Sequence, residues 1–390
     1  MACYVPQQKI AANSLSPITL LQIVPSLARS GLARATLDTA QAVIADGGRA
    51  IVASPGGAML PDLLRLRATH IDLPEWGSPL AARLSLPARL AANLRHSDVN
   101  IIQSRSPVAG WVASSLSRRL KVKCIATLHR PFGARGFMER RAERRQLQAD
   151  VVIAVSDHVA RDVRAHVSGA TDRLYTISPG INLDRFDPAQ VRADRVVQLA
   201  GDLRVPDGSH VVLCPARFDR DRGQKLLVEA IRRLGRENVF CLLLGSTGAP
   251  TAFEKDVEQA IAAAKLHGRV QIGPYVEDMP AAYMLADVVV ALGGKAQGIS
   301  RPLLEAQAMG RPVVAEDGGG AAEAFLPGAT GWLATPGDPA ALAGALDTAL
   351  SLSPQRRSEL AATAQNHVRG RYDLTVTNQQ LLELFQLITA

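Results

Sequence analysis

Glycines, cations and carboxylates lie close together between residues 293 and 323, with a spacing that suits phosphate and ribose chemistry. The apolar run before them, residues 288–292, predicts a buried strand, and Pro302 and Gly310 are typical of the start and the end of a helix. A glycine-rich turn between a strand and a helix N-terminus gathers N–H groups and the positive end of a dipole around a phosphate. Glu305 lies early in this helix, where its carboxylate could turn back towards a ribose.

Further candidate residues follow two other predicted strands. Arg217 and Arg222 lie in the loop after residues 211–214, and two cations there suit a diphosphate, whose charge must be neutralised when bound and more so as it leaves. Arginines on a loop are otherwise usually solvated. His129 comes after residues 122–128, and ligands of parallel α/β folds bind at the carboxyl ends of strands. A lone histidine is, by itself, more often structural.

The elements that must position these residues are strands and helices. They alternate in two successive series along the chain. This pattern predicts an α/β protein with two doubly wound parallel sheets, and 390 residues are enough for two domains. Two such domains that face each other would bring the carboxyl ends of both sheets to one cleft. The expected organisation is a flexible N-terminal tail (1–17), a first domain (18–180), a linker rich in Pro, Gly and Asp (181–207), a second domain (208–372) and a final helix that crosses back (373–390).

Composition indicates a soluble globular protein, because 47% of the residues are hydrophobic and 21% are charged. No apolar run reaches the ~18 residues of a membrane span, and the N-terminus does not have the pattern of a signal peptide. The cysteines lack metal-binding spacing, and Cys124, Cys214 and Cys241 lie in apolar runs, so we expect reduced core thiols in a cytoplasmic protein. The sequence has no Asp-x-Asp metal motif at a position that suits this fold.

The positive charge of the chain is concentrated in residues 118–145. This segment holds ten basic and two acidic residues, an excess that equals the formal net charge of +8 for the whole chain. A local basic patch attracts anionic lipid, nucleic acid or a phosphorylated substrate, although a solvated face has the same composition. Aromatic residues make up only 4% of the chain, which argues against a single-stranded nucleic acid.

Together these motifs resemble the signature of the family 4 glycosyltransferases, retaining enzymes of the GT-B fold that include bacterial lipopolysaccharide and cell-envelope transferases. The family frames its loop with two glutamates that are separated by seven residues: the first binds the transferred sugar and the second binds the ribose. Glu305 occupies the second position and Gln297 the first. The resemblance implies that His129 and Gln297 are the catalytic, sugar-facing residues. It also implies a donor-binding set, namely Gly31, Arg217, Arg222, Tyr275, Ser300, Arg301, Leu303 and Glu305.

The resemblance implies a retaining hexosyltransferase that moves a sugar from a nucleoside-diphosphate sugar to a hydroxyl of a glycan or lipid-linked acceptor in cell-envelope or lipopolysaccharide synthesis. Neither a cofactor nor a metal is expected, nor a nucleic acid partner, and the basic patch 118–145 would dock on an anionic inner membrane. Two alternatives stay open. The chain departs from the family at Ser30, Arg130, Arg222, Gln297, Ser300 and Pro302, which is compatible with a catalytically silent GT-B protein that binds a nucleotide or a partner. A sugar-nucleotide epimerase of the same fold is the other.

Overall fold

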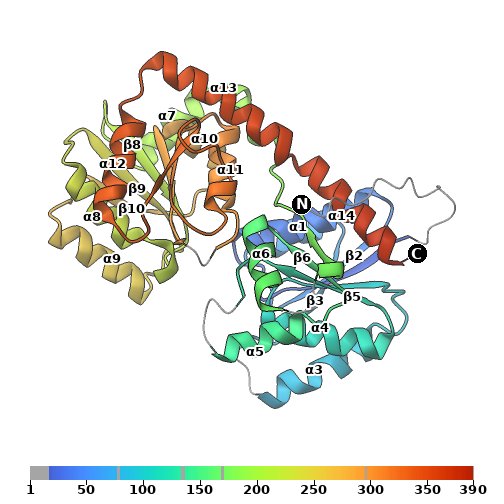
Figure 1. Cartoon of the computed structure of the whole chain (residues 1–390). Helices are drawn as coiled ribbons and strands as arrows, with labels where there is room; N and C mark the ends of the chain where they lie inside the picture. Colours follow the sequence, from blue (N-terminus) through green and yellow to red (C-terminus); the bar gives the residue numbers. More distant parts are fainter. Residues whose placement is uncertain (1–16, 77–79, 133–136, 168–170, 295–296, 390) are drawn as a thin grey trace. The chain divides into compact units, whose positions relative to one another are not determined.

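The computed structural model describes residues 17–76, 80–132, 137–167, 171–294 and 297–389, which form two compact units. The first unit comprises the described residues up to Pro179 together with those from Thr375 onward, and the second is Gly180–Leu374. The expected tail (1–17), apart from its last residue, and residues 295 and 296 of the glycine-rich loop lie outside the described residues. Each unit is a parallel sheet covered by helices, as the sequence predicts (Figure 1).

The first sheet has seven parallel strands in the order β3-β2-β1-β4-β5-β6-β7. Its central strand β1 pairs with β2 on one side, Leu20 opposite Ala50, and with β4 on the other, Leu20 opposite Ile101. The strand order therefore reverses between β1 and β4. The strands are β1 (Thr19–Ile23), β2 (Arg49–Ser54), β3 (Thr69–Asp72), β4 (Ile101–Ser104), β5 (Lys123–Leu128), β6 (Val151–Ala154) and β7 (Leu174–Thr176).

Helices cover both faces of this sheet because successive side chains of a strand point to opposite faces. Leu21 and Ile23 of β1 pack in one core with residues of α3, α4 and α6, whereas Leu20 packs in another with α1 and α14. The helices of this unit are α1 (Gly31–Ala45), α2 (Leu60–Arg65), α3 (Leu80–Asn93), α4 (Pro107–Leu120), α5 (Phe137–Gln146), α6 (Asp157–His166), the short 3-10 helix η1 (Thr171–Arg173) and α14 (Leu374–Thr389).

The second sheet has six parallel strands in the order β10-β9-β8-β11-β12-β13, and its strand order reverses between β8 and β11. The apolar runs at residues 211–214 and 288–292 predicted β8 and β11, whereas the four-residue edge strand β13 was not predicted. The strands are β8 (His210–Pro215), β9 (Val239–Ser246), β10 (Val270–Pro274), β11 (Val288–Ala291), β12 (Val313–Glu316) and β13 (Gly331–Ala334).

Two separate cores lie on the two faces of the second sheet. Val212 and Cys214 of β8 face residues of α8, α9 and α12, while Val211 and Leu213 face α10, α11 and α13. The helices are α7 (Ala193–Asp202), α8 (Gln224–Leu234), α9 (Ala252–Ala263), α10 (Met279–Leu285), α11 (Arg301–Ala308), α12 (Pro339–Leu350) and α13 (Pro354–Arg371), with the 3-10 helices η2 (Pro188–Gln190), η3 (Arg220–Arg222) and η5 (Ala321–Glu323).

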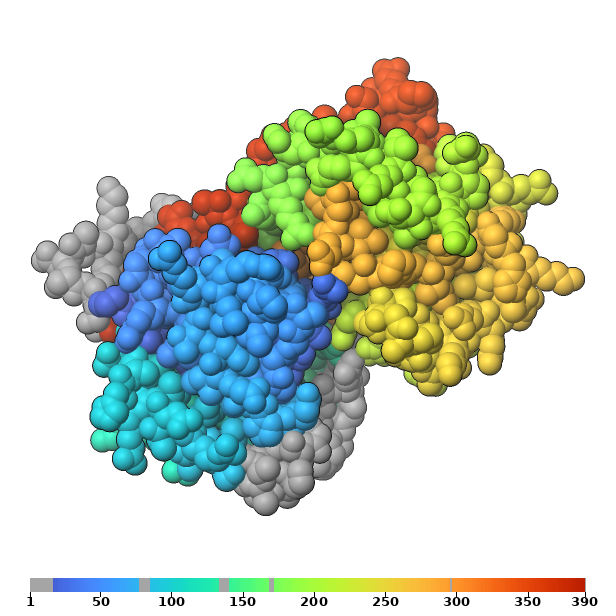
Figure 2. Space-filling view, turned by 180° about the vertical axis from the view of Figure 1, so that it is seen from behind, coloured from blue at the N-terminus to red at the C-terminus, as the bar shows by residue number. Residues whose placement is uncertain are grey.

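The segment 181–207, which we expected to be a linker, is part of the second unit. It contains α7, whose Leu199 packs on the core of that unit, and Figure 2 shows the lime-green α7 directly against the orange α10. Arg195 of α7 makes a two-pronged ion pair with Asp278, with N–O distances of 2.9 and 2.6 Å. Asp278 also caps α10 by accepting from Ala281 N. The Pro- and Asp-rich start of the segment concealed the amphipathic helix that follows.

Three cysteines predicted to be in the core are buried and carry free thiols: Cys124, Cys214 and Cys241. Burial raises the pKa of Cys124 and Cys214 to about 12, so both thiols are protonated and unreactive. Among the described residues, no helix is both long and apolar enough to cross a bilayer.

Candidate functional site

The candidate residues of the second unit lie where the order of its strands reverses. The loops that leave the carboxyl ends of the neighbouring strands β8 and β11 carry Arg217, Arg222 and Gln297, and open parallel sheets bind ligands at this kind of position. The sequence assigned these residues to separate loops, and the structure brings two of them into direct contact.

Gln297 and Arg222 are joined by a hydrogen bond. Arg222 Nη1 donates to Gln297 Oε1 at 2.6 Å, and Gln297 Nε2 in turn donates to the backbone oxygen of Asp221 at 3.2 Å. Both ends of the Gln297 amide are thereby used to hold the loop that carries Arg222. Because the amide is neutral, this hydrogen bond adds no negative charge beside the arginine.

Two glycines permit this contact between loops. Gly223 ends η3 with a φ of +66°, and a Cβ there would lie 2.6 Å from Leu292 Cβ. Gly319, with a φ of +62°, would place a Cβ 2.4 Å from Gln297 O, while Gly320 N donates to the same oxygen at 2.9 Å. Larger residues would push the loops apart, which explains why glycines are required at both places.

Glu316 is a residue of this region that the sequence reading missed. It ends β12 with a buried carboxylate, which accepts from Gly293 N at 2.8 Å and from Gly337 N at 2.9 Å. Glu316 therefore fixes the start of the glycine-rich loop. An acid at the end of an apolar strand was the available signal.

Glu305, the expected ribose ligand, lies on α11 with each carboxylate oxygen near a different partner. Oε2 accepts a hydrogen bond of 2.8 Å from the hydroxyl of Tyr283, and Oε1 lies 3.6 Å from Arg301 Nε. Tyr283 is fully buried on α10 and was not predicted. Burial and the adjacent Glu305 raise the pKa of Tyr283 well above its usual value, so its hydroxyl stays protonated and donates.

The other expected donor ligands differ in what they expose. Arg217 is exposed, and its backbone oxygen accepts from Gln224 Nε2 at 2.8 Å. The side chain of Tyr275 is 37% exposed, and its backbone N–H donates a hydrogen bond to Ser246 O. Ser300 occupies the cap position of α11 without a side-chain cap. The Leu303 side chain is fully buried, so this residue contributes to the core. Its backbone N–H donates a hydrogen bond to Ser300 O.

In the first unit, Gly31 and His129 follow strands on the two sides of its reversal point. Gly31 is the exposed first residue of α1, whose N-cap Ser30 accepts from Ala33 N at 3.2 Å. His129 follows β5 and is half-buried, and its enclosed Nε2 is among the polar atoms without a hydrogen-bond partner in the described chain. A polar group in this state is suited to a partner that arrives with a ligand.

Charge and burial around His129 keep its imidazole neutral. Burial, with smaller effects from the cations Arg105 and Arg130, lowers the pKa of His129 from 6.5 to about 3. Arg105 is itself buried and donates to Gln22 Oε1 at 3.1 Å and to Thr39 Oγ1 at 2.6 Å. A neutral imidazole can both donate and accept a hydrogen bond, which suits sugar hydroxyls.

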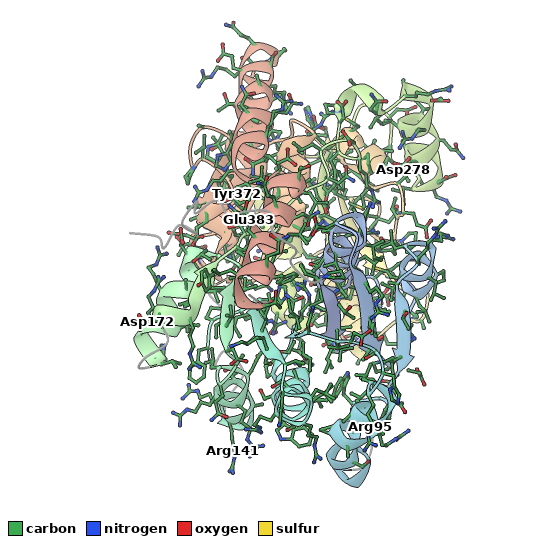
Figure 3. The ribbon with its side chains drawn as sticks, turned by 90° about the vertical axis from the view of Figure 1, so that its right-hand side faces the viewer. Arg95, Arg141, Asp172, Asp278, Tyr372 and Glu383 are labelled. Carbon is green, nitrogen blue, oxygen red and sulfur yellow. The ribbon has the colours of Figure 1, made fainter. Side chains whose placement is uncertain are left out.

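The basic patch includes one charged face of α5. Arg140, Arg141, Arg144 and Arg145 are exposed on this helix, whereas Glu143 is buried. Figure 3 shows Arg141 at the outer edge of the molecule. The four arginines therefore form a solvent-facing cationic stripe.

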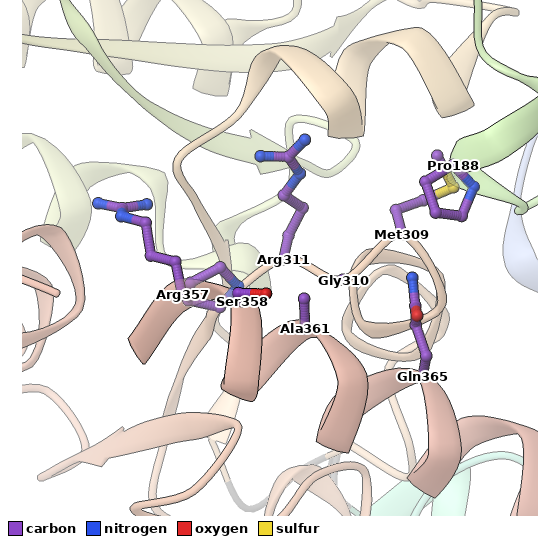
Figure 4. A pocket seen from close by; sticks show the side chains of 9 residues that line it. Pro188, Met309, Gly310, Arg311, Arg357, Ser358, Ala361 and Gln365 are labelled. Carbon is purple, nitrogen blue, oxygen red and sulfur yellow. The ribbon is translucent and has the colours of Figure 1, made fainter. Parts of the chain in front are cut away.

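The second unit also has a crevice that holds none of the candidate residues. It has a volume of about 310 Å³ and lies between the turn after α11 and the helix α13 (Figure 4). Its polar lining comes from Arg311, Arg357, Ser358 and Gln365. Arg357 already contacts Asp287, at 3.3 Å. Within the described ranges, no cluster of three or more His, Cys, Asp or Glu side chains is arranged to hold a metal ion.

Two parallel α/β units, with cations and a glycine-rich loop at the reversal point of the second sheet, define a protein of the GT-B class. A model of "Glycosyltransferase Family 4" matches residues 29–185, and one of "Glycosyl transferases group 1" matches residues 199–367. The D-inositol 3-phosphate glycosyltransferase of Frankia alni is 30% identical over 324 residues, which are 77% of this chain and 76% of that protein. The chain therefore belongs to the family 4, or group 1, glycosyltransferases.

Other relatives agree with this assignment. The D-inositol 3-phosphate glycosyltransferase of Xylanimonas cellulosilytica is 33% identical over 221 residues, 56% of this chain, and the chain spans only 52% of that relative. A glycosyltransferase from Rickettsia africae superimposes with a TM-score of 0.83 at 25% identity, over 96% of this chain and 99% of that one. Anabaena HepE, solved with UDP-glucose, has a TM-score of 0.82 at 23% identity, over 94% and 99%, and this likeness shows the fold alone.

Proposed function

We propose that this protein transfers a sugar, with retention of configuration, from a nucleoside-diphosphate sugar to a hydroxyl of a glycan or a lipid-linked acceptor. The observation that carries the proposal is the pairing of Arg222 with the neutral Gln297 beside the glycine-rich loop. This pairing places the cation of Arg222 where a diphosphate would bind, and catalysis of sugar transfer depends on stabilising that leaving group.

Each residue has a proposed role. Arg217 and Arg222 bind the diphosphate, and Glu305 accepts hydrogen bonds from the ribose. Gln297 and the neutral His129 bind hydroxyls of the sugar. The departing phosphate takes the proton from the acceptor, so no further protein base is required. The UDP-glucose held by Anabaena HepE supports a uridine nucleotide as the first donor to test.

The acceptor belongs to a broader class. The names of the curated relatives mention D-inositol 3-phosphate, and the cationic stripe on α5 fits an anionic lipid surface. We propose a cytoplasmic protein that associates peripherally with the inner membrane, where it would serve cell-envelope or lipopolysaccharide synthesis. Anionic headgroups attract basic segments through a salt-dependent field.

A second candidate function is nucleotide binding without transfer. Both ends of the Gln297 amide already hold the Asp221–Arg222 segment, which would leave less of this side chain for a sugar. In that case the protein would bind the nucleoside diphosphate and its sugar conjugate equally.

Calorimetric titration separates the two candidates. UDP, GDP and ADP, each alone and as its glucose conjugate, would be titrated into the full chain, and donor hydrolysis would be followed by chromatography. A transferase should bind one sugar conjugate more tightly than its diphosphate and hydrolyse it slowly. Equal affinities without turnover would leave the silent binder, and no binding by any nucleotide would refute both.

A further inference from the structure

We infer that Tyr283 is a positioning residue that fixes the ribose-binding carboxylate of Glu305. The inference rests on the proposed function, since it assigns Glu305 to the ribose. The two residues are far apart in sequence, and their contact is a single hydrogen bond of 2.8 Å from the phenol to Oε2. A hydrogen bond to a carboxylate is stronger than one between neutral groups.

Tyr283 cannot itself reach a ligand, because it is fully buried and its ring lies among the core residues of the second unit. The ring centroid of Phe186 lies 6.0 Å from that of Tyr283, in a tilted arrangement. The hydroxyl therefore points from a fixed ring to a carboxylate whose side chain is 14% exposed. Any effect of Tyr283 on a ligand must pass through Glu305.

The geometry leaves the carboxylate free to accept more hydrogen bonds. Tyr283 uses one lone pair of Oε2, and Arg301 Nε lies 3.6 Å from Oε1. An ionised carboxylate has about four acceptor positions, so a ribose diol can still be bound. The phenol thus selects one orientation of a flexible side chain before the ribose arrives, and a preorganised acceptor binds more tightly.

The support for Tyr283 extends back to α7. Tyr283 lies on the short helix α10, whose N-terminal Asp278 is held by Arg195 and accepts from Ala281 N at 3.2 Å. The segment that we first took for a linker therefore helps to set the position of the phenol.

The test replaces Tyr283 by Phe, which keeps the ring in the core and removes only the hydroxyl. Tyr372→Phe is the matched control, since Tyr372 is a buried tyrosine of the same unit whose hydroxyl donates to the backbone oxygen of Glu323. Melting temperatures would establish that both variants fold. UDP, GDP and ADP and their 2′-deoxy and 3′-deoxy counterparts would be titrated into each protein.

For the nucleotide that wild type binds, Tyr283→Phe should lower the affinity of the ribose form about tenfold, as expected for one hydrogen bond to a charged group. The affinity of at least one deoxy form, which already lacks a hydroxyl for Glu305, should change less than threefold. In the Glu305→Gln background, Tyr283→Phe should have a smaller effect than in wild type, because the two residues act as one unit.

An equal loss for ribose and deoxyribose forms, or no loss at all, would overturn the inference and leave Tyr283 as a structural residue. Failure of wild type to bind any of the nucleotides would instead overturn the proposed function. Tyr372→Phe should keep the ribose preference of wild type, and its loss in this control would also count against a specific role for Tyr283.

Discussion

Gln297→Glu adds one negative charge at the contact between the two loops of the second unit. In wild type the amide accepts from Arg222 at 2.6 Å and donates to Asp221 O at 3.2 Å. The new carboxylate would keep the arginine but would face the Asp221 oxygen without a proton to donate. Loss of that hydrogen bond should lower the stability of the fold by about 1 kcal/mol.

The larger effect concerns the ligand. Gln297 is half-buried, so a carboxylate there is partly screened, and its repulsion of a diphosphate held by Arg222 should cost on the order of 1 kcal/mol. UDP affinity should then fall about five- to tenfold. A carboxylate also binds a sugar hydroxyl more strongly than an amide does, by about 1 kcal/mol, so UDP-glucose should lose little and turnover should be kept or increased.

The assay is calorimetric titration of UDP and UDP-glucose into wild type and Gln297→Glu at low and high salt. Gln198→Glu is the matched control, because it makes the same charge change at an exposed glutamine of α7 in the same unit. The ratio of UDP-glucose to UDP affinity should rise about five- to tenfold in Gln297→Glu alone. Undiminished UDP affinity at low salt would show that Arg222 does not act on the diphosphate, and the reasoning would be wrong.

Three further predictions concern charged or titratable side chains. Arg217→Ala should abolish most of the rise in melting temperature that a saturating nucleoside diphosphate gives; an unchanged rise would remove this exposed arginine from the site. The pKa of His129 is about 3 in the folded protein and 6.5 when the side chain is exposed. As the pH drops below about 6.5, the unfolded chain therefore binds a proton that the folded protein does not. The free energy of unfolding should then decrease by at most ~1.4 kcal/mol per pH unit. Chemical denaturation at pH 7 and pH 5 should show a smaller decrease for His129→Asn than for wild type, and equal decreases would contradict a buried neutral imidazole. Arg141→Ser combined with Arg145→Ser should weaken sedimentation with anionic vesicles roughly tenfold at low salt, whereas equal binding of wild type to neutral vesicles would exclude docking through charge.

Much of the fold was predictable because parallel strands buried on both faces appear as continuous apolar runs. The run at residues 288–292 became β11, and the strand expected over residues 211–214 lies within β8. The strand β13 was not predicted because it has only four residues, Gly331–Ala334, and lies at the edge of the sheet. Helix α7 was not predicted because its stability comes from packing on α10 and from the Arg195–Asp278 ion pair. Neither contact can be inferred from the local sequence.

The sequence could propose candidate site residues one by one, but it could not predict the contacts between them. The motif spacing pointed to Arg222, Gln297 and Glu305, yet the bond between the first two joins loops that are 75 residues apart. Tyr283 is a buried core residue, and only its hydroxyl links it to Glu305. Contacts of this kind depend on how strands order themselves in the sheet, and the sequence pattern carries that information only indirectly.

The placement of α14 has a consequence for the order in which the protein can fold during synthesis. Leu384 and Phe385 of this helix cover an apolar face of the first sheet that includes Ile18 and Leu20. The ribosome makes those strands before it makes α14, and the intervening Gly180–Leu374 takes on the order of 10–40 s to translate at ~5–20 residues per second. During this interval the nascent first unit exposes a hydrophobic strip that a chaperone could bind, and its folding can be completed only when α14 has left the ribosome.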